Sequence, residues 1–197
     1  METRRRGRPV LVDPEELGRR ALAVIAEHGY AAVTMGQIAT ESGVSVRTLH
    51  RYFPSKADVV WGSLSQAVTK LRDALAAADP DVPLLTAIEE AVVSVFDPLV
   101  EADETERTRL QLIATTAELH EYQSEPFQLW RRDLIAFAAA RLGLDPDDVV
   151  PAAIASATQS ATLVALTWWA THENAGAPGD VARRALGALG DGIRVGE

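Results

Sequence analysis

The sequence has no cysteine and no long uninterrupted apolar run. Without cysteine there is no disulfide framework, no thiolate zinc site and no cysteine nucleophile. The first residues, METRRRGRP, are not followed by an apolar segment, and no stretch of about 18 consecutive apolar residues occurs elsewhere. We therefore expect a cytoplasmic protein with neither a signal peptide nor a membrane-spanning helix.

Motifs of catalysis and metal binding are missing as well. The four histidines, at positions 28, 50, 120 and 172, lack the paired spacing of a metal site, and neither G-x-S-x-G nor H-E-x-x-H occurs. This predicts that the chain is not an enzyme and uses no cofactor or metal. A helical enzyme is kept only as the alternative from another functional class.

Charge is distributed unevenly along the 197 residues, whose formal net charge is -9. Residues 1–56 carry nine Arg and Lys against six Asp and Glu, a net of +3, whereas residues 57–197 carry ten against twenty-two, a net of -12. A basic head on an acidic body is compatible with nucleic-acid binding by the head, because the local field matters more than the sum.

The periodicity predicts an all-α fold, since signals for strands are lacking. Asp13 followed by Pro14 is a strong helix start, and Thr34, Ser45 and Ser55 are further expected N-caps. Apolar residues at helical spacing between such starts and Gly or Pro stops indicate the helices. We expect them at about 14–28, 34–42, 45–53, 55–78, 84–101, 104–121, 126–142, 147–173 and 180–194.

A short helix, a turn at Gly43 and a second short helix form a helix-turn-helix pattern between residues 34 and 53. Leu49 and Phe53 lie one turn apart on one face of the second helix, so Arg47 and Arg51 project from the other side. Arginine, imidazole and hydroxyl groups are the types that bind guanine edges and phosphates. A short polar helix on the surface of any bundle also exposes such side chains, so this pattern alone leaves both readings open.

The segment from Thr34 to Lys56, TMGQIATESGVSVRTLHRYFPSK, closely resembles the signature of the TetR family of regulators. The resemblance covers most of residues 13–60. It implies phosphate contacts by Thr48, Tyr52 and Lys56, and base reading in the major groove by Val46, Arg47 and His50. Arg51 is exposed on the helical wheel, although the family often packs this position. The full set of DNA-binding residues expected is Thr34, Ser45, Val46, Arg47, Thr48, His50, Arg51, Tyr52 and Lys56.

The resemblance also implies the organisation of the chain. Residues 1–12 are expected to be a basic flexible arm, residues 13–60 the helix-turn-helix DNA-binding domain, and residues 61–197 a ligand-binding and dimerisation domain. The run Arg4-Arg5-Arg6-Gly7-Arg8 resembles arms that enter the minor groove, and a solvated tail is the equal alternative. The implied partners are a double-stranded DNA operator, a second copy of the chain and a small apolar ligand.

The segment 152–166 is apolar nearly all round and rich in small residues, so it must be buried on most sides. With the last helix it is expected to build a two-fold four-helix dimer interface, although a simple core helix is the alternative. Polar and aromatic side chains in this half are candidates for lining a ligand cavity, and ordinary core packing is the alternative for each. They are Trp61, Thr115, Glu118, His120, Tyr122, Phe127, Trp130, Gln159, Thr162 and Trp168.

Segments between residues 100 and 170, including Arg109-Leu110, Trp130 and Arg141-Leu142-Gly143, are similar to actinobacterial TetR proteins with an acyl-CoA-like ligand-binding C-terminal domain. Arg107, Arg109, Arg131 and Arg132 are then the candidates for holding phosphates. The resemblance implies a repressor released from a palindromic operator by the ligand, through movement of the helix at 55–78. A constitutive DNA-binding regulator without an effector is the alternative.

Overall fold

The computed structural model describes residues 13–62, 64–96, 104–121, 124–173 and 175–190, without the side chains of residues 120 and 121. Within these residues all regular structure is helical, as expected. In chain order, the helices are α1 (Pro14–His28), α2 (Met35–Glu41), α3 (Val46–Tyr52), α4 (Lys56–Trp61), α5 (Leu64–Ala77), α6 (Leu84–Phe96), α7 (Glu104–Thr115), α8 (Ala117–Glu121), α9 (Glu125–Leu142), α10 (Val149–Thr171) and α11 (Pro178–Gly190).

The expected caps place the helices of the head. The side chain of Asp13 accepts a hydrogen bond from the backbone N–H of Glu15, with Pro14 in the first turn. Thr34 and Ser45 accept from N–H groups at the starts of α2 and α3. Ser55 and Asp58 form a reciprocal capping box at the start of α4. Each cap satisfies backbone donors that the helix itself leaves without partners.

Two expected helices are divided in the structure. The helix predicted over 55–78 is wrong as a single element, because α4 ends at Trp61 and α5 begins at Leu64. Gly62 lies at the end of α4, where an added Cβ would meet the carbonyl oxygen of Asp58 at 2.8 Å and the Phe53 ring at 3.0 Å. The helix predicted over 104–121 is also interrupted, between α7 and α8. A glycine or threonine inside a periodic pattern does not by itself mark such a break.

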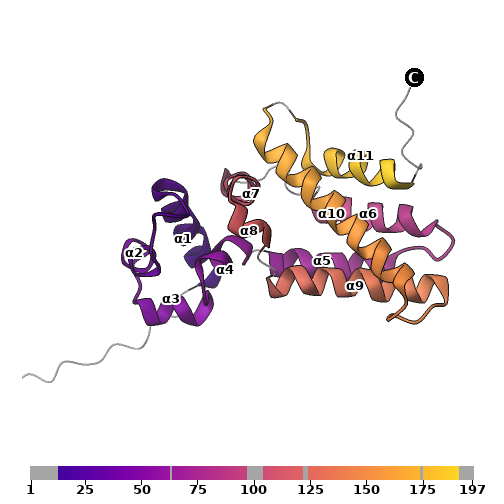
Figure 1. Cartoon of the computed structure of the whole chain (residues 1–197), viewed down its shortest axis with the longest axis horizontal. Coiled ribbons are helices and arrows are strands. Elements are labelled where there is room, and N and C mark those ends of the chain that lie inside the picture. The colour runs from indigo at the N-terminus through magenta and orange to yellow at the C-terminus, as the bar shows by residue number, and fades with distance from the viewer. Residues whose placement is uncertain (1–12, 63, 97–103, 122–123, 174, 191–197) are drawn as a thin grey trace, which may run out of the picture.

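Helices α1 to α4 make a small head at one end of the molecule, and α5, α6, α9, α10 and α11 make a larger bundle at the other (Figure 1). Helix α7 lies between the two and packs against α1, α4 and α10. The core of the head includes Leu17, Ile25, Ile38 and Leu49, all completely buried. The fold therefore couples the head to the bundle through α7.

Helix α10 is the long central element of the bundle. Its length and apolar composition are those of a helix able to cross a membrane, judged by these two properties alone. It packs against α7, α9 and α11 in the bundle. One such helix is weak evidence for a span, because the core helix of a bundle passes the same test.

Candidate DNA-binding and ligand-binding sites

Helix α3 has one buried apolar face and one exposed polar face. Leu49 is completely buried and Phe53 nearly so, which fixes the rotation of the helix. Arg47, His50 and Arg51 are exposed on the opposite side, as the helical wheel predicts. Val46, at the start of the same helix, is 43% exposed. This face is suited to contact with the methyl groups and acceptor edges of a major groove.

Local hydrogen bonds orient several of these side chains. The hydroxyls of Ser45 and Thr48 lie 2.8 Å apart. The Nδ1 atom of His50 lies 3.0 Å from the carbonyl oxygen of Pro54. Arg51 donates from Nη2 to the hydroxyl of Tyr52 at 2.9 Å, and its guanidinium lies 4.7 Å from the centre of that ring. Arg51 is thus exposed, as the helical wheel predicts, and its guanidinium lies along the side chain of Tyr52.

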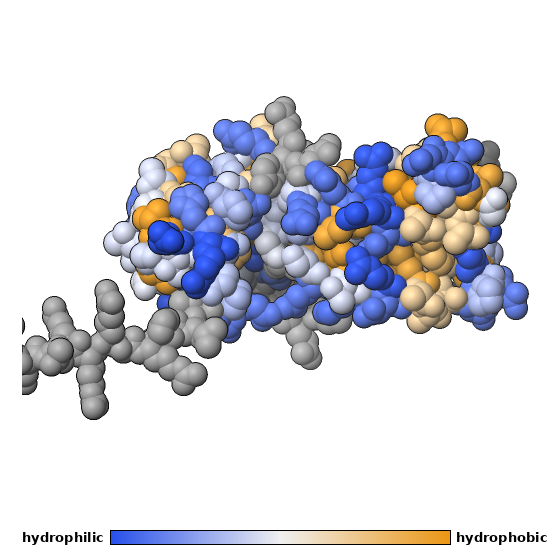
Figure 2. Space-filling model, turned by 90° about the horizontal axis from the view of Figure 1, so that it is seen from below, coloured by the Kyte–Doolittle hydropathy of each residue, from blue (hydrophilic) through white to orange (hydrophobic). Residues whose placement is uncertain are grey.

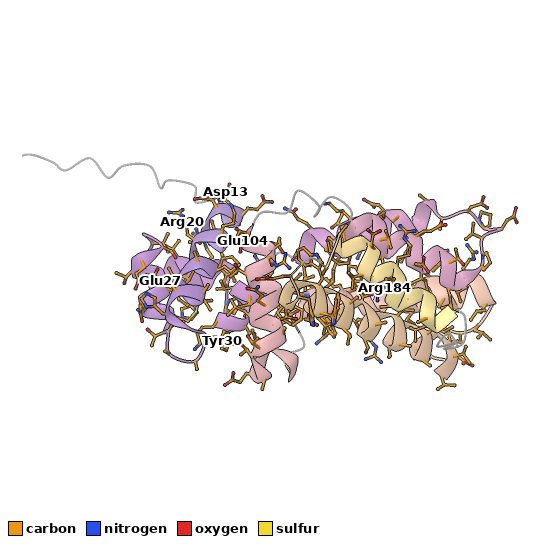
Figure 3. The ribbon with its side chains drawn as sticks, turned by 90° about the horizontal axis from the view of Figure 1, so that it is seen from above. Asp13, Arg20, Glu27, Tyr30, Glu104 and Arg184 are labelled. Carbon is orange, nitrogen blue, oxygen red and sulfur yellow. The ribbon has the colours of Figure 1, made fainter. Side chains whose placement is uncertain are left out.

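The turn between α2 and α3 has the geometry expected of a helix-turn-helix. Gly43 has a φ of 74°, in the left-handed region that favours glycine. On the adjacent surface of the head, Arg20 donates from Nη1 to the carbonyl oxygen of Ser42 at 3.1 Å and so ties α1 to the end of α2 (Figure 3). Thr34, another expected contact residue, is exposed at the start of α2, and its hydroxyl accepts from the N–H of Gln37 at 3.2 Å.

Lys56 lies half-buried at the start of α4 and turns its charge into the head. Its Nζ donates to the carbonyl oxygens of Tyr30, at 2.6 Å, and Val33, at 2.9 Å. The same atom lies 4.8 Å from the centre of the Tyr30 ring. Figure 3 places Tyr30 at the lower edge of the head in the view from above. The structure gives Lys56 a role in holding the loop after α1, and contact with phosphate stays a prediction.

An exposed ion pair joins α1 to α2. The Nε2 of His28 and a carboxylate oxygen of Glu41 lie 2.9 Å apart. The hydrogen bond to Glu41 raises the pKa of His28, and the hydrogen bond from His28, followed by that from Gln37, lowers the pKa of Glu41. Glu27 approaches the same pair, and all three residues are exposed.

A small apolar cavity lies in the bundle, next to the end of α4. Its volume is about 40 Å³. Five of the predicted ligand-binding residues line it, namely Trp61, Phe127, Trp130, Gln159 and Thr162. Its other walls are mainly aliphatic. Ligand pockets usually measure about 300 to 1,000 Å³, so the helices must separate before this cavity accepts more than a fragment.

The rest of the predicted ligand set lies elsewhere. Thr115 and Glu118 are exposed on α7 and α8, and Trp168 is 40% exposed on α10, where it stacks on His172 with ring centres 4.2 Å apart. None of these three lines the cavity. Tyr122 and the side chain of His120 lie outside the described residues.

A second, larger hollow separates the head from the bundle. This outer cleft has a volume of about 560 Å³ and is bounded by α1, α4, α5, α7 and the start of α9. Trp61 and Pro126 line both the outer cleft and the inner cavity. Trp61 packs edge-on against Phe127, with ring centres 5.7 Å apart. No local pattern in the sequence predicts this cleft, because its wall comes from segments far apart in the chain.

Arg109 crosses from α7 to the end of α4. It is 5% exposed, donates from Nη1 to the carbonyl oxygens of Val59, at 3.0 Å, and Val60, and pairs through Nε with Glu106 at 3.2 Å. Arg107, two residues earlier on α7, instead donates to the carbonyl oxygens of Trp169 and His172 at the end of α10. The four arginines considered for phosphate binding are therefore used in different places, with Arg131 and Arg132 exposed on α9.

Comparisons with known proteins agree with this architecture. Residues 19–60 match the model for bacterial regulatory proteins of the tetR family, and residues 82–194 match the model for the MftR C-terminal domain. MftR of Mycobacterium tuberculosis, assigned as a regulator of mycofactocin biosynthesis, is 29% identical over 191 residues, which are 96% of this chain and 93% of that protein.

Solved structures show the same fold. The fatty acid degradation regulator FadR from Bacillus halodurans has a TM-score of 0.65 at 20% identity, covering 92% of this chain and 96% of its own. FadR from Bacillus subtilis, solved in complex with stearoyl-CoA, has a TM-score of 0.64 at 18% identity, covering 92% of this chain and all of its own. With its capped helix-turn-helix head and an MftR-type C-terminal domain, the chain belongs to the TetR family of transcriptional regulators.

Proposed function

We propose that this regulator is a cytoplasmic repressor that binds a pseudo-palindromic DNA operator as a homodimer and is released by a small apolar ligand. The observation that carries the DNA-binding part is the face of α3, where Arg47 and His50 are exposed above a fully buried Leu49. One helix of seven residues contacts few base pairs, so two copies spaced by about one DNA turn, 34 to 36 Å, are needed for specificity.

The residues proposed to contact DNA fall into two groups, one that reads bases and one that binds phosphates. Val46, Arg47 and His50 are proposed to read bases, whereas Thr34, Ser45, Thr48 and Tyr52 are proposed to hold phosphates, with Arg51 and Lys56 contributing charge nearby. The matching division of the chain is an arm over 1–12, a DNA-binding head over 13–60 and a sensing and dimerising domain over 61–197. The arm lies outside the described residues.

The dimer is supported by the uncovered face of α10. Positions at helical spacing along this helix are exposed and mostly small or apolar: Val150, Ala153, Ala157, Ser160, Val164 and Trp168. Figure 2 shows apolar residues reaching the surface of the C-terminal lobe. A stripe of small residues permits close approach of a second copy of α10, and α11 lies beside it.

The ligand part is supported by the apolar inner cavity beside Trp61 and by the structural relative that holds stearoyl-CoA. Because the cavity is only about 40 Å³, a ligand larger than a fragment must push the helices apart to enter it, and this favours a second arrangement of the bundle. A preference of about 1 to 3 kcal/mol for that arrangement weakens operator binding roughly 5- to 150-fold.

The test of base reading is selection of a consensus site from random duplexes with wild-type protein and with Arg47→Ala. We expect the variant to lose preference at one position in each half-site, at a cost of about 1 to 3 kcal/mol for each contact. Thr48→Ala is the matched control, since loss of a phosphate contact weakens all sequences alike. An unchanged consensus in Arg47→Ala would exclude the base-reading role.

A further inference from the structure

Trp61 is the one described residue whose buried ring nitrogen has no hydrogen-bond partner. The side chain is 3% exposed, and its Nε1 is shielded from solvent and unpaired. A buried N–H without an acceptor costs free energy comparable to a lost hydrogen bond, so such a group signals an absent partner. The indole also stands where the inner cavity and the outer cleft meet, since it lines both.

The two hollows differ in chemistry. The inner cavity is walled by Val68, Phe96, Leu166 and other apolar side chains. The outer cleft carries charged and polar groups from both lobes, and its volume of about 560 Å³ lies within the range of ordinary ligand sites. An apolar space that shares Trp61 and Pro126 with a polar one suits an amphiphile whose apolar tail lies inside and whose polar group lies outside.

The charges of the outer cleft restrict the polar group that a ligand can place there. The lining residues include four carboxylates, those of Glu15, Asp58, Glu106 and Glu125, against two guanidiniums. Arg109 is committed to Glu106 and to the carbonyl oxygens of α4, and Arg19 to Glu16. The cleft is therefore negative on balance, and an uncharged polar group of a ligand meets less electrostatic repulsion there than a polyphosphate group does.

We propose that the two hollows form one binding site for an acylated amphiphile, and that Trp61 Nε1–H donates to the acyl carbonyl oxygen. In such a molecule the acyl carbonyl lies between the apolar chain and the polar group. Trp61 lines both the apolar cavity and the polar cleft, so it lies where that carbonyl would be. Phe127, packed on Trp61, is displaced as the tail enters. The inference rests on the proposed release by a small apolar ligand and defines the chemical class of that ligand.

The test uses two uncharged probes that differ in one carbonyl: the dodecanoyl thioester of N-acetylcysteamine and the corresponding S-dodecyl thioether. Binding of each to the full-length protein is measured by calorimetry, and operator binding by mobility shift. One neutral hydrogen bond predicts about threefold to tenfold tighter binding of the thioester to wild type. Trp61→Phe, which keeps an aromatic ring, should bind both probes equally.

Trp130→Phe is the matched control, because Trp130 lines the inner cavity but not the cleft. It should retain the preference for the thioester, whatever its affinity. A second readout uses the wild-type protein. The indole N–H resonance of Trp61 in a proton–nitrogen spectrum should move downfield when the thioester binds and not when the thioether binds.

The outcomes separate this inference from the proposed function. Equal affinity of wild type for the two probes, or a preference that survives in Trp61→Phe, overturns the role of Trp61 even when both probes release the operator. Preferential thioester binding without any change in operator affinity supports the site and removes the proposed regulation. Failure of both probes to bind overturns the site and the apolar ligand class together.

Discussion

Lys56 has two possible functions that one pair of measurements separates. Its Nζ bonds to the carbonyl oxygens of Tyr30 and Val33, whereas the family resemblance predicts a phosphate contact. We expect Lys56→Met to lower the free energy of unfolding by about 1.5 to 3 kcal/mol, because charge-assisted hydrogen bonds inside the head are lost. Chemical denaturation of the full chain measures this.

The DNA readout for the same variant is the salt dependence of operator binding. If Lys56 also contacts phosphate, the slope of log affinity against log salt falls by roughly 0.9 for each half-site, and otherwise it stays unchanged. Lys70→Met is the control, since Lys70 is exposed on α5. Unfolding stability equal to that of wild type would refute the structural role.

The His28–Glu41 pair predicts a pH dependence of the head. The raised pKa of His28 means that its contribution to stability is present below the ordinary histidine pKa and is lost as pH rises through the raised value. The lowered pKa of Glu41 means the opposite sign: its contribution is present above the ordinary pKa and is lost as pH falls through the lowered value. The link between α1 and α2 is therefore complete only at pH values above the ordinary pKa of glutamate and below the ordinary pKa of histidine.

Proton NMR of the His28 ring measures the titration directly. Glu41→Gln should bring the pKa of His28 down toward its ordinary value and remove the loss of stability at the alkaline end of the window. A His28 titration that does not respond to the substitution would refute the pairing.

At the scale of elements, the starts of helices were predictable and their interruptions were not. Caps such as Asp13, Ser45 and Ser55 act on N–H groups within three residues, so the local sequence determines them. The separation of α4 from α5 depends on Phe53 packing against Gly62, a contact that only the folded head creates. Local periodicity contains no information on such contacts.

The candidate sites show the same division. The face of α3 was predictable because Leu49 and Phe53 fix the rotation of a short amphipathic helix. Helix α10 is apolar nearly all round, so its sequence does not say that Thr162 is buried at the cavity while Trp168 is exposed. Likewise, nothing local distinguishes the buried Arg109 from an arginine on the surface.

Arg109 replaces the single long helix as the predicted link between ligand and DNA. Because α4 is short, we expect movement of the bundle to reach the head through α7 and the hydrogen bonds of Arg109 to the end of α4. We expect Arg109→Met to cost about 1 to 3 kcal/mol of stability and to bring the coupling between ligand and operator close to one. The coupling is the ratio of ligand affinities with and without operator.

The control for this link is Arg107→Met, which removes hydrogen bonds from α7 to the end of α10 but none to α4. It should weaken the bundle while leaving most of the coupling. If Arg109→Met still folds and its ligand affinity responds to operator as strongly as in wild type, the signal takes another route.

At the scale of the whole molecule, the head and the uncovered face of α10 lie on different parts of an elongated chain (Figure 1). If this face is the dimer interface, as proposed, operator binding depends on a surface far from DNA. Arg184 on α11 lies well away from the head in the view from above (Figure 3). The two recognition helices are held at one DNA turn only if α10 and α11 pair with a second copy. Dimerisation and operator affinity should then fail together.

Val164 is the position on α10 to test, because its side chain is 64% exposed in the middle of the uncovered stripe. Val164→Glu places two like charges in a dry symmetric interface, where each lacks a partner and the cost exceeds that of a surface substitution. We expect a folded monomer at micromolar concentration in sedimentation and a loss of operator affinity of at least tenfold. Leu142→Glu, at a residue 43% exposed at the end of α9, introduces the same charge away from the stripe and should stay dimeric. A Val164→Glu protein that remains dimeric and binds operator as wild type does would place the interface elsewhere and leave the face of α10 without a function.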